Sequence, residues 1–564
     1  MIPAHFLPKV APDEFICPPI APTENRLEVG VLFVGAGPAN LSGAIRLMQL
    51  LNETPDLKAS LGEIPVAIVE KGKYVGAHLL AGAVFNPMAL KRLFPDLKTG
   101  EFPLDIPVQK EAFYFLTKGR SFRLPVPPTM HNRGHYAVSL SRLGRWLAQE
   151  AEKLGVAIFT ETSAVKLLVE NQVIRGIKTG DKGRDRTGAP LPNFQEGVEI
   201  IAKVTILGEG GCGHLTQSAL THFGVGRLNP QTYSLGVKEV WEVQKPLDRV
   251  IHTMGWPLRG GRAFGEFGGS FVYPMGPKKV SLGLVVGLGY RDATLSVHDL
   301  LQEMKTHRFF KNLLEGGRRI AWGAKTIPEG GYASVPERLA FPGALIVGDS
   351  AGLLNVPAIK GIHYASTSGM LAAETIFSAL RTKKSLSSMD TLSQYDTAVR
   401  QSFMMKELYA VRNMRPAFNY GLAPGVILSG LMTLTHGIFP GGIWKTKADR
   451  DEPLFIGQRS ALPQDGQTIF DKLSSVYLSG NKSRDDQPNH IRVQTDVPEA
   501  VREAWIHMCP ANVYEAQPRV AGSPPPADGL RLNPTNCIQC GAISAKGGQF
   551  TPPEGGSGPE YQET

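Results

Sequence analysis

The sequence lacks most of what would mark a small secreted protein or a nucleic-acid-binding one. Only five cysteines occur in 564 residues, too few and too scattered for a disulfide framework, so we expect a reducing compartment. The net charge of +9 is modest for this length, and without a basic cluster we expect no nucleic-acid partner. The stretch 1–28 has no basic flank followed by an apolar run. We therefore expect an irregular N-terminal arm rather than a secretory signal.

Long apolar runs are also missing. Residues 416–444 contain no Asp, Glu, Lys or Arg, but the apolar core of that window, 426–439, is only 14 residues long. A membrane-spanning helix needs about 20 apolar residues. Basic residues flank the window at Arg412, Arg415, Lys445 and Lys447. This arrangement favours a helix lying in the membrane interface with its basic flanks at the headgroups, and an ordinary buried helix is the alternative.

Two further segments have open interpretations. Residues 111–130 combine Phe, Tyr and Leu with a proline-rich exit, which suits either a second membrane-dipping element or a core hairpin. Gly268 and Gly269 are paired inside a predicted strand, where glycines indicate a bulge or a backbone that contacts a flat ligand. The sequence alone favours the bulge. Within the apolar window, we expect Leu431 and Met432 to face lipid.

A dinucleotide-binding turn is predicted near the N-terminus. An apolar strand over 29–34 leads directly into Gly35-Ala36-Gly37-Pro38-Ala39-Asn40, and an apolar-periodic helix follows. Gly35 permits the tight turn, and Gly37 lets the backbone approach a pyrophosphate at the helix N-terminus. Asn40 stands where the fingerprint has its third glycine. The next strand ends in Glu70, the acidic residue expected at the adenosine ribose.

A second cofactor signal lies about 280 residues later. The apolar stretch 344–347 ends in Gly348-Asp349 and is followed by a helical pattern. Flavoproteins with two dinucleotide-type segments present an Asp in this way to the ribityl chain, and the next helix N-terminus faces the flavin ring. The alternative is that Asp349 caps a helix. Because both halves occur in the right order, we predict FAD rather than NAD.

Three of the five cysteines are grouped near the C-terminus. Cys537 and Cys540 form a C-x-x-C pair, and Cys509 precedes Pro510 in the form of the remote ligand of ferredoxin-type clusters. The third position of the C-x-x-C-x-x-C run is Ile543. Three thiolates can hold an iron–sulfur cluster, or zinc with a fourth ligand such as His507, or they can be a remnant that binds nothing. Cys212 is expected to line the cofactor domain as a small buried residue.

Taken together, these residues resemble the electron transfer flavoprotein–ubiquinone oxidoreductase family, from about residue 28 to the C-terminus. The blocks that carry the resemblance include VGAGPANLSGAIRL, QTYSLGVKEVW, FGGSFVYP, NVPAIKGIHYA, DQPNHI, CPANVYE and PPEGGSGPEY. So many long blocks in one order are specific to this family.

The resemblance implies an α/β fold (α+β overall) with three interwoven parts behind the arm at 1–28. A two-dinucleotide-type FAD domain is expected over 29–110, 131–235 and 320–400. A domain for quinone and membrane contact is expected over 111–130, 236–319 and 401–450. A small ferredoxin-like iron–sulfur domain is expected over 451–564.

The resemblance also implies a set of binding residues. The quinone headgroup is expected at Gly268 and Gly269, and the cluster at Cys509, Cys537 and Cys540, either four-iron (4Fe–4S) as in the family or three-iron (3Fe–4S) because of Ile543. No side chain is expected to act as a nucleophile or general acid. FAD is expected to lie against Gly35, Ala36, Gly37, Pro38, Ala39, Glu70, Lys71, His78, Gly82, Gly348, Asp349, Gly361 and Ile362.

The function implied is electron transfer from reduced electron transfer flavoprotein, through FAD and the cluster, to ubiquinone or another membrane quinone. The protein is then expected to be monotopic, on the inner face of a respiratory membrane, which in a bacterium is the cytoplasmic side. Two alternatives stay open. One is an FAD-dependent isoprenoid-lipid reductase of the geranylgeranyl type, and the other is a non-catalytic membrane-associated subunit with a degenerate cluster site.

Overall fold

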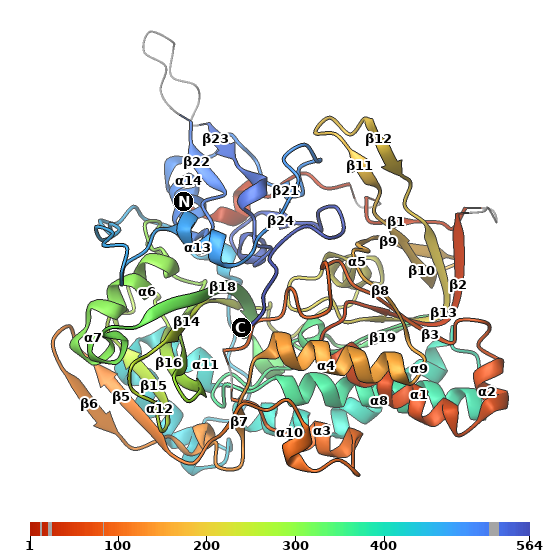
Figure 1. The fold of residues 1–564 in the computed structure, drawn as a ribbon, viewed down its shortest axis with the longest axis horizontal. Coiled ribbons are helices and arrows are strands. Elements are labelled where there is room, and N and C mark those ends of the chain that lie inside the picture. Colours follow the sequence, from red (N-terminus) through yellow and green to blue (C-terminus); the bar gives the residue numbers. More distant parts are fainter. Residues whose placement is uncertain (12–13, 21–24, 83, 518–528) are drawn as a thin grey trace, which may run out of the picture.

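Two large β-sheets lie side by side in the computed structural model, which describes residues 1–11, 14–20, 25–82, 84–517 and 529–564 (Figure 1). The first sheet has nine strands, in the order β1-β9-β10-β13-β2-β3-β8 with β20 beside β13 and β19 beside β20. Its strands are β1 (Ile16–Cys17), β2 (Arg26–Val34), β3 (Val66–Val69), β8 (Ala157–Phe159), β9 (Ala164–Glu170), β10 (Val173–Thr179), β13 (Glu199–Leu207), β19 (Ala340–Phe341) and β20 (Ala344–Ile346).

The centre of this sheet is parallel and buried on both faces. β2 pairs in parallel with β13 and with β3. Every residue from Val29 to Val34 is buried, in an apolar run. A nearly continuous apolar sequence is what a central parallel strand requires when both of its faces are buried.

Helices α1, α4 and α8 lie together beneath this sheet in Figure 1. α1 and α8 cross closely because Gly43 of α1 and Gly369 of α8 face each other, and a Cβ on Gly369 would overlap the carbonyl of Ala39. The helices of the molecule are α1 (Pro38–Asn52), α2 (Pro55–Ala59), α3 (Met88–Leu93), α4 (Leu140–Lys153), α5 (His214–His222), α6 (Val297–Thr306), α7 (Arg308–Leu314), α8 (Ile362–Arg381), α9 (Met389–Gln401), α10 (Phe403–Ala410), α11 (Met414–Ala417), α12 (Leu422–Leu434), α13 (Lys472–Leu478), α14 (Glu499–Met508) and α15 (Ala542–Ala545).

The second sheet has seven strands, in the order β18-β14-β17-β16-β15-β5-β6, and only its β15–β5 pair is parallel. Its strands are β5 (Glu111–Leu116), β6 (Ser121–Leu124), β14 (Tyr233–Glu242), β15 (Val250–Gly255), β16 (Gly268–Gly276), β17 (Lys279–Gly287) and β18 (Arg318–Pro328). Residues 111–130 thus form an edge hairpin of this sheet, and β6 is exposed along its whole length. The mixed α/β architecture confirms the predicted fold class.

The N-terminal arm is more ordered than the sequence indicated. β1 pairs in parallel with β9, through Ile16 and Leu167, and the amino group of Met1 donates to the carbonyl oxygen of Leu454 at 3.1 Å. The prediction of an irregular arm is therefore wrong for these residues. A short strand can form here because the edge of β9 offers unpaired backbone groups.

The C-terminal segment is built from turns, short helices and small two-stranded ribbons, and its helices α13 and α15 contact β18 and β14 of the second sheet. Its backbone bonds directly to the first domain: the N–H of Gly556 donates to Lys71, and that of Tyr561 to Ala77. The described residues form four such ribbons, β4 (Ile106–Pro107) with β7 (Tyr136–Ala137), β11 (Lys182–Arg184) with β12 (Pro190–Gln195), β21 (Ile491–Arg492) with β24 (Gln549–Phe550), and β22 (Tyr514–Ala516) with β23 (Leu530–Leu532).

None of the helices in the described ranges is both long and apolar enough to cross a membrane.

Candidate functional site

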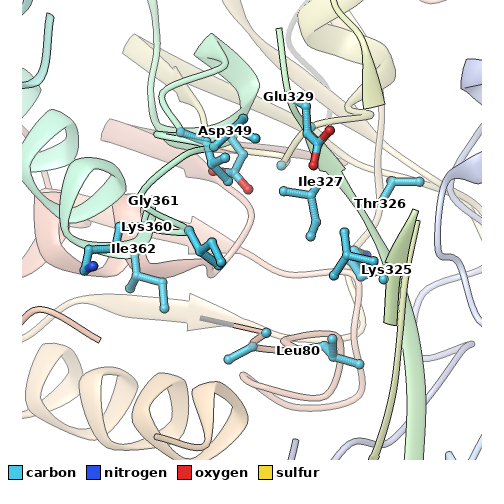
Figure 2. A pocket seen from close by; sticks show the side chains of 18 of the residues that line it. Leu80, Lys325, Thr326, Ile327, Glu329, Asp349, Lys360, Gly361 and Ile362 are labelled. Carbon is cyan, nitrogen blue, oxygen red and sulfur yellow. The ribbon is translucent and has the colours of Figure 1, made fainter. Parts of the chain in front are cut away.

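One cavity of about 860 Å³ runs between the two sheets. Figure 2 shows residues around it: Lys325, Thr326, Ile327 and Glu329 on one side, Asp349 and the 360–362 turn on the other, and Leu80 below. The residues predicted for the cofactor and for the quinone all line this cavity: Gly35, Ala36, Gly37, Pro38, Ala39, Glu70, Lys71, His78, Gly82, Gly268, Gly269, Gly348, Asp349, Gly361 and Ile362. Segments far apart in the sequence therefore meet around one space.

The dinucleotide turn has the geometry that its sequence predicts. Gly35 has φ +94°, a backbone conformation that favours glycine, and its N–H donates to Val69 at 2.8 Å. α1 begins at Pro38, and its first residues, Pro38 and Ala39, line the cavity, at the end of the helix where N–H groups lack intrahelical partners. A Cβ built on Gly37 would meet no atom within 4 Å. The open space beside Gly37 fits a pyrophosphate held against the helix N-terminus.

Glu70 closes this turn from the neighbouring strand. Its carboxylate accepts the N–H of Ala36 at 2.8 Å and that of Gly72 at 2.7 Å. The two bonds hold the side chain at the carboxyl end of β3, in the wall of the cavity.

Asn40 takes over a structural task at the position of the missing third glycine. Its amide nitrogen donates to the carbonyl oxygens of Val34 at 2.8 Å and Gly35 at 2.7 Å. The side chain is buried and fits because its neighbour is Gly208, where any Cβ would collide with the amide. The substitution therefore leaves the strand–helix packing intact.

Charged groups in the cavity wall have shifted pKa values. Burial raises the pKa of Asp349 to about 6, although Lys325 opposes the shift. Burial lowers the pKa of Lys71 to about 7, and the nearby Lys325 lowers it further. An anionic cofactor would relieve the repulsion between these two lysines.

Sequence reasoning missed Lys238 of β14. Its ammonium is buried and donates to the carbonyl oxygen of Ala81 at 2.8 Å, and burial lowers its pKa to about 7. Lysines are almost never fully buried unless paired. The signal in the sequence was an adjacent pair of charges, Lys238 and Glu239, inside the otherwise apolar stretch 235–241.

The glycine pair at 268–269 does not form a bulge, so that prediction is wrong. Gly268 and Gly269 pair in regular register with Val286 and Val285, and the irregularity in β16 lies further on, between Pro274 and Gly276. The glycines are needed for close approach, since a Cβ on Gly268 would overlap the carbonyl of Val285. Their backbone also lines the cavity.

One end of the cavity is walled by the apolar window. Leu422, Val426, Gly430 and Leu434 of α12 line it, as do residues 127–130 that follow β6. The outer side of the same region is exposed: Ile427 is 64% exposed, Leu434 78% and Ile438 80%. A cluster of exposed large apolar side chains marks an interaction surface for lipid or protein.

Some residues in and beside this window face the protein interior, although the sequence predicted that they face the membrane. Met432 is 1% exposed and packs with Met414 and Ala417, so only Leu431 of the predicted pair is exposed. Arg412 is buried and donates to the carbonyl oxygens of Gly437 and Gly442.

Arg415 does not reach a headgroup either. It pairs with Glu329 at 3.2 Å in the cavity wall. The expectation that both arginines contact headgroups is wrong, because Arg412 bonds carbonyl groups of the loop after α12 and Arg415 is paired with Glu329.

A second, small cavity lies in the C-terminal segment, and Cys509, Cys537 and Cys540 all line it. The sulfur of Cys509 accepts the N–H groups of Ala511 and Val513, each at 3.4 Å, and that of Cys537 accepts the N–H of Gln539 at 3.4 Å. Burial raises the pKa of Cys537 to about 12. Buried thiols of this kind become thiolates when metal compensates the charge, and converging sulfurs with N–H donors suit an iron–sulfur cluster.

The zinc alternative does not fit. His507 is not part of the small cavity's wall, and its ring lies 3.4 Å from the carboxylate of Glu503. Over the described part of the chain, no three His, Cys, Asp or Glu side chains are placed to hold a single metal ion. Thiolates that bind different irons of a cluster stand further apart than ligands of one ion, so both observations agree with a cluster.

The two cavities share a wall. Cys540, Gly541 and Phe550 line both of them. Cys212 lines the large cavity, as expected, and its thiol lies 3.2 Å from the hydroxyl of Thr326, which in turn donates to the carbonyl oxygen of Cys540. A cofactor in the large cavity would therefore lie next to the cysteine loop.

Comparisons with known proteins bear on each of these regions. A family model described as "ETF-QO, ubiquinone-binding" matches residues 233–327, which span the strands around Gly268. A second, described as "Electron transfer flavoprotein-ubiquinone oxidoreductase, 4Fe-4S", matches residues 466–562, which contain the three cysteines.

Curated relatives cover nearly the whole chain. Mitochondrial electron transfer flavoprotein–ubiquinone oxidoreductase of Arabidopsis thaliana is 40% identical over 95% of this chain and 84% of its own length. The Mus musculus protein of the same name is 40% identical over 95% of this chain and 89% of its own length.

A solved structure shows the fold alone. It is described as geranylgeranyl bacteriochlorophyll reductase-like, from Thermoplasma acidophilum, with a TM-score of 0.55 at 19% identity over 72% of this chain and 92% of its own. The curated relatives are similar enough, over enough of their length, to decide the family. This chain belongs to the electron transfer flavoprotein–ubiquinone oxidoreductase family.

Proposed function

We propose that this protein oxidises reduced electron transfer flavoprotein and reduces a membrane quinone, with FAD in the large cavity and an iron–sulfur cluster at Cys509, Cys537 and Cys540. One observation carries the proposal. A single cavity extends from the Gly35 turn to the apolar wall of α12 and shares residues with the cysteine cavity. The two cofactors and an apolar acceptor would thus meet within one enclosed region.

Each part of the cavity has a role in this proposal. The backbone at Gly35 and Gly37 and the N-terminus of α1 hold the pyrophosphate, and Glu70 receives the ribose. Asp349 receives the ribityl chain, and the N-terminus of α8 at Ile362 faces the flavin ring. FAD, when bound, accepts electrons singly and can release them in pairs, which suits a donor of single electrons and a two-electron quinone.

The quinone would reach the flavin from the membrane. We propose that the exposed apolar residues of α12 and the 111–130 hairpin lie in the lipid interface, and that the quinone headgroup contacts the backbone of Gly268 and Gly269. No side chain of these glycines intervenes, so a flat ring can lie directly on the strand. The protein is then monotopic.

The proposed location is the inner face of a respiratory membrane, which in a bacterium is the cytoplasmic side. The five cysteines of the protein are all free thiols, which suits a reducing compartment. We also propose the division into discontinuous FAD and quinone domains and a C-terminal cluster domain, with the boundaries given above.

The test is quinol formation from reduced electron transfer flavoprotein, in the wild type and in Cys537→Ser. We expect the variant to lose iron and at least about tenfold of its quinone reductase rate. FAD should stay bound, because Cys537 lines only the small cavity. Cys17→Ser is the matched control, since Cys17 lies on the distant strand β1, and it should keep both iron and rate.

The alternatives predict other results. An isoprenoid-lipid reductase would give no quinol and would saturate the double bonds of an isoprenoid lipid. A non-catalytic subunit would do neither and would contain less than about one iron atom per chain. Either outcome would overturn the proposed function.

A further inference from the structure

We propose that the three cysteines hold a three-iron cluster (3Fe–4S) instead of a four-iron one (4Fe–4S), because the side chain of Ile543 occupies the place of the fourth ligand. The inference depends on the proposed function in one respect, that a cluster is bound at these thiols. It goes beyond that function by assigning the cluster type to one residue of this chain.

Ile543 is in the wall of the cluster cavity. It follows Cys540 at the spacing of a third cysteine in a C-x-x-C-x-x-C run. Gly541, with φ +86°, turns the chain into α15, and the Ile543 side chain lines the same small cavity as the three thiols. At 5% exposure it offers that cavity only hydrocarbon.

The local backbone keeps Ile543 in this position. Its carbonyl oxygen accepts the N–H groups of Lys546 and Gly548, each at 3.0 Å. Its side chain packs so closely on Gly548 that a Cβ there would overlap it. Trp505 ties the end of the turn by donating to the carbonyl oxygen of Lys546 at 2.8 Å. The isoleucine therefore cannot turn away to admit another ligand without breaking this packing.

The remaining wall offers no substitute thiolate. Besides the cysteines, the lining side chains with a heteroatom are Met508 and Tyr514, and the others are hydrocarbon or glycine. Thioether and phenol are not the ligands of cysteine-held clusters. His490 is buried with both ring nitrogens unpartnered, yet it packs edge-on against Phe550 and is not in the cavity wall.

The donor count then sets the cluster type. Each iron of such a cluster is tetrahedral and needs one terminal ligand in addition to its bridging sulfides. Three thiolates supply three irons. A fourth iron would have no protein ligand at position 543, and a water bound in its place would lie among apolar groups. The stable core is therefore one that lacks this iron.

The wild-type protein, purified anaerobically with FAD bound, tests this directly. We expect about three iron atoms and about four acid-labile sulfides per chain. We also expect an electron spin resonance signal of an oxidised three-iron cluster that disappears on reduction with dithionite. Four iron atoms with a spectrum that is silent when oxidised and appears on reduction would overturn the inference.

A labile fourth iron could be lost during purification, so the protein is next incubated with ferrous iron and a reductant. We expect no conversion in the wild type. Conversion to a four-iron spectrum would show an accessible fourth site and overturn the inference. Ile543→Cys supplies the missing thiolate and should convert, while Ile543→Val keeps an apolar side chain and should not. A cysteine variant that folds and stays three-iron would also overturn the assignment to residue 543.

Failure of this inference is distinguishable from failure of the proposed function. Quinol formation together with a four-iron spectrum would leave the function standing and remove the inference. A three-iron spectrum without quinol formation would leave the inference standing and overturn the proposed function. Iron below about one atom per chain would overturn both.

Discussion

Asn40 illustrates how a single side chain can replace a motif glycine. The amide bonds the carbonyl oxygens of Val34 and Gly35, so it braces the turn that Gly35 makes possible. The larger side chain is accommodated because Gly208 has no side chain of its own. Asn40→Ala would remove the side-chain partner of the Gly35 carbonyl and one of the two partners of the Val34 carbonyl, which also accepts the N–H of Gly208.

Asn40→Ala should therefore weaken FAD binding. The loss of two hydrogen bonds at about 0.5–1.5 kcal/mol each corresponds to an increase of about tenfold in the dissociation constant. Titration of FAD into the cofactor-free protein measures it. Asn52→Ala, at the other end of α1, removes a bond to the carbonyl of Leu154 and should leave the affinity unchanged. Equal affinity in both variants would show that the amide does not organise the turn.

At the scale of one element, α12 has two different faces. Leu422, Val426 and Gly430 line the cavity, and Met432 packs into a small core. Ile427 and Leu434 are exposed, and so is Ile438, which follows the helix. A helix with so much exposed apolar surface is stable in water only when something covers it. Lipid is the cover that the proposed function supplies.

Ile427→Glu combined with Ile438→Glu should release the protein from liposomes, because each change places a charge in the lipid interface. We expect the membrane-bound fraction in a flotation assay to fall at least about tenfold. Tyr477→Glu is the matched control, since Tyr477 is 84% exposed on α13, and it should bind as the wild type does. Full binding by the double variant would show that this exposed surface does not contact lipid, which would favour a protein interface there.

β14 carries a buried ionic network that joins two strands of the second sheet, β14 and β18, to helix α6. The carboxylate of Glu239 accepts from Lys305 of α6 at 2.8 Å and from Arg319 of β18 at 3.2 Å. It also accepts from the ring nitrogen of Trp241 at 2.8 Å and from Gln302 at 3.1 Å. All five side chains are buried, so solvent cannot replace a missing partner.

Glu239→Gln should lower the free energy of unfolding by about 3 to 5 kcal/mol, because it leaves two buried cations without their counter-charge. Urea unfolding measures the loss. Glu242→Gln on the same strand breaks only the exposed pair with Arg318 and should cost less than about 1 kcal/mol. Similar losses in the two variants would mean that the buried network adds no more than a surface pair.

At the scale of the whole molecule, the C-terminal segment belongs to the flavin site as much as to the cluster site. Its backbone bonds Lys71 and Ala77, and Lys325 of β18 donates to the carbonyl oxygen of Gln539 at 3.1 Å. The ring of Phe550 lies under the ammonium of Lys71 at 4.9 Å. The two cofactor regions are therefore expected to unfold together.

His490 links this packing to pH. Burial, and then the charge of Lys71, lower its pKa to about 3 from an ordinary value near 6.5. Between about pH 6.5 and pH 3, His490 is therefore protonated in the unfolded chain and neutral in the folded protein. The stability that depends on a neutral His490 is complete above about pH 6.5 and is lost as the pH falls toward 3.

Between pH 7 and pH 5, the wild type should thus lose about 1 to 2 kcal/mol more than His490→Gln, measured by urea unfolding at constant FAD concentration. His5→Gln, on the exposed end of the N-terminal arm, should keep the wild-type pH dependence. If His490→Gln kept the wild-type pH dependence, folding would not lower the pKa of the His490 imidazole.

The sequence by itself determined the features that depend on a few neighbouring residues. The Gly35 turn after an apolar strand, the Gly348-Asp349 turn and the spacing of Cys537 and Cys540 each predict a local binding chemistry. The family that the longer sequence blocks resemble, and the fold class that this resemblance implies, are confirmed. Short-range backbone geometry and ligand spacing depend on consecutive residues, so they can be predicted without knowledge of the fold.

Only the tertiary structure decided which side of a segment is buried. It turned Met432 inward, used Arg412 inside the protein, and kept the strand regular at Gly268. It also brought the Cys540 loop into the wall of the flavin cavity. Burial and pairing are set by contacts between residues distant in sequence, and the local pattern of a segment carries no information about its partner.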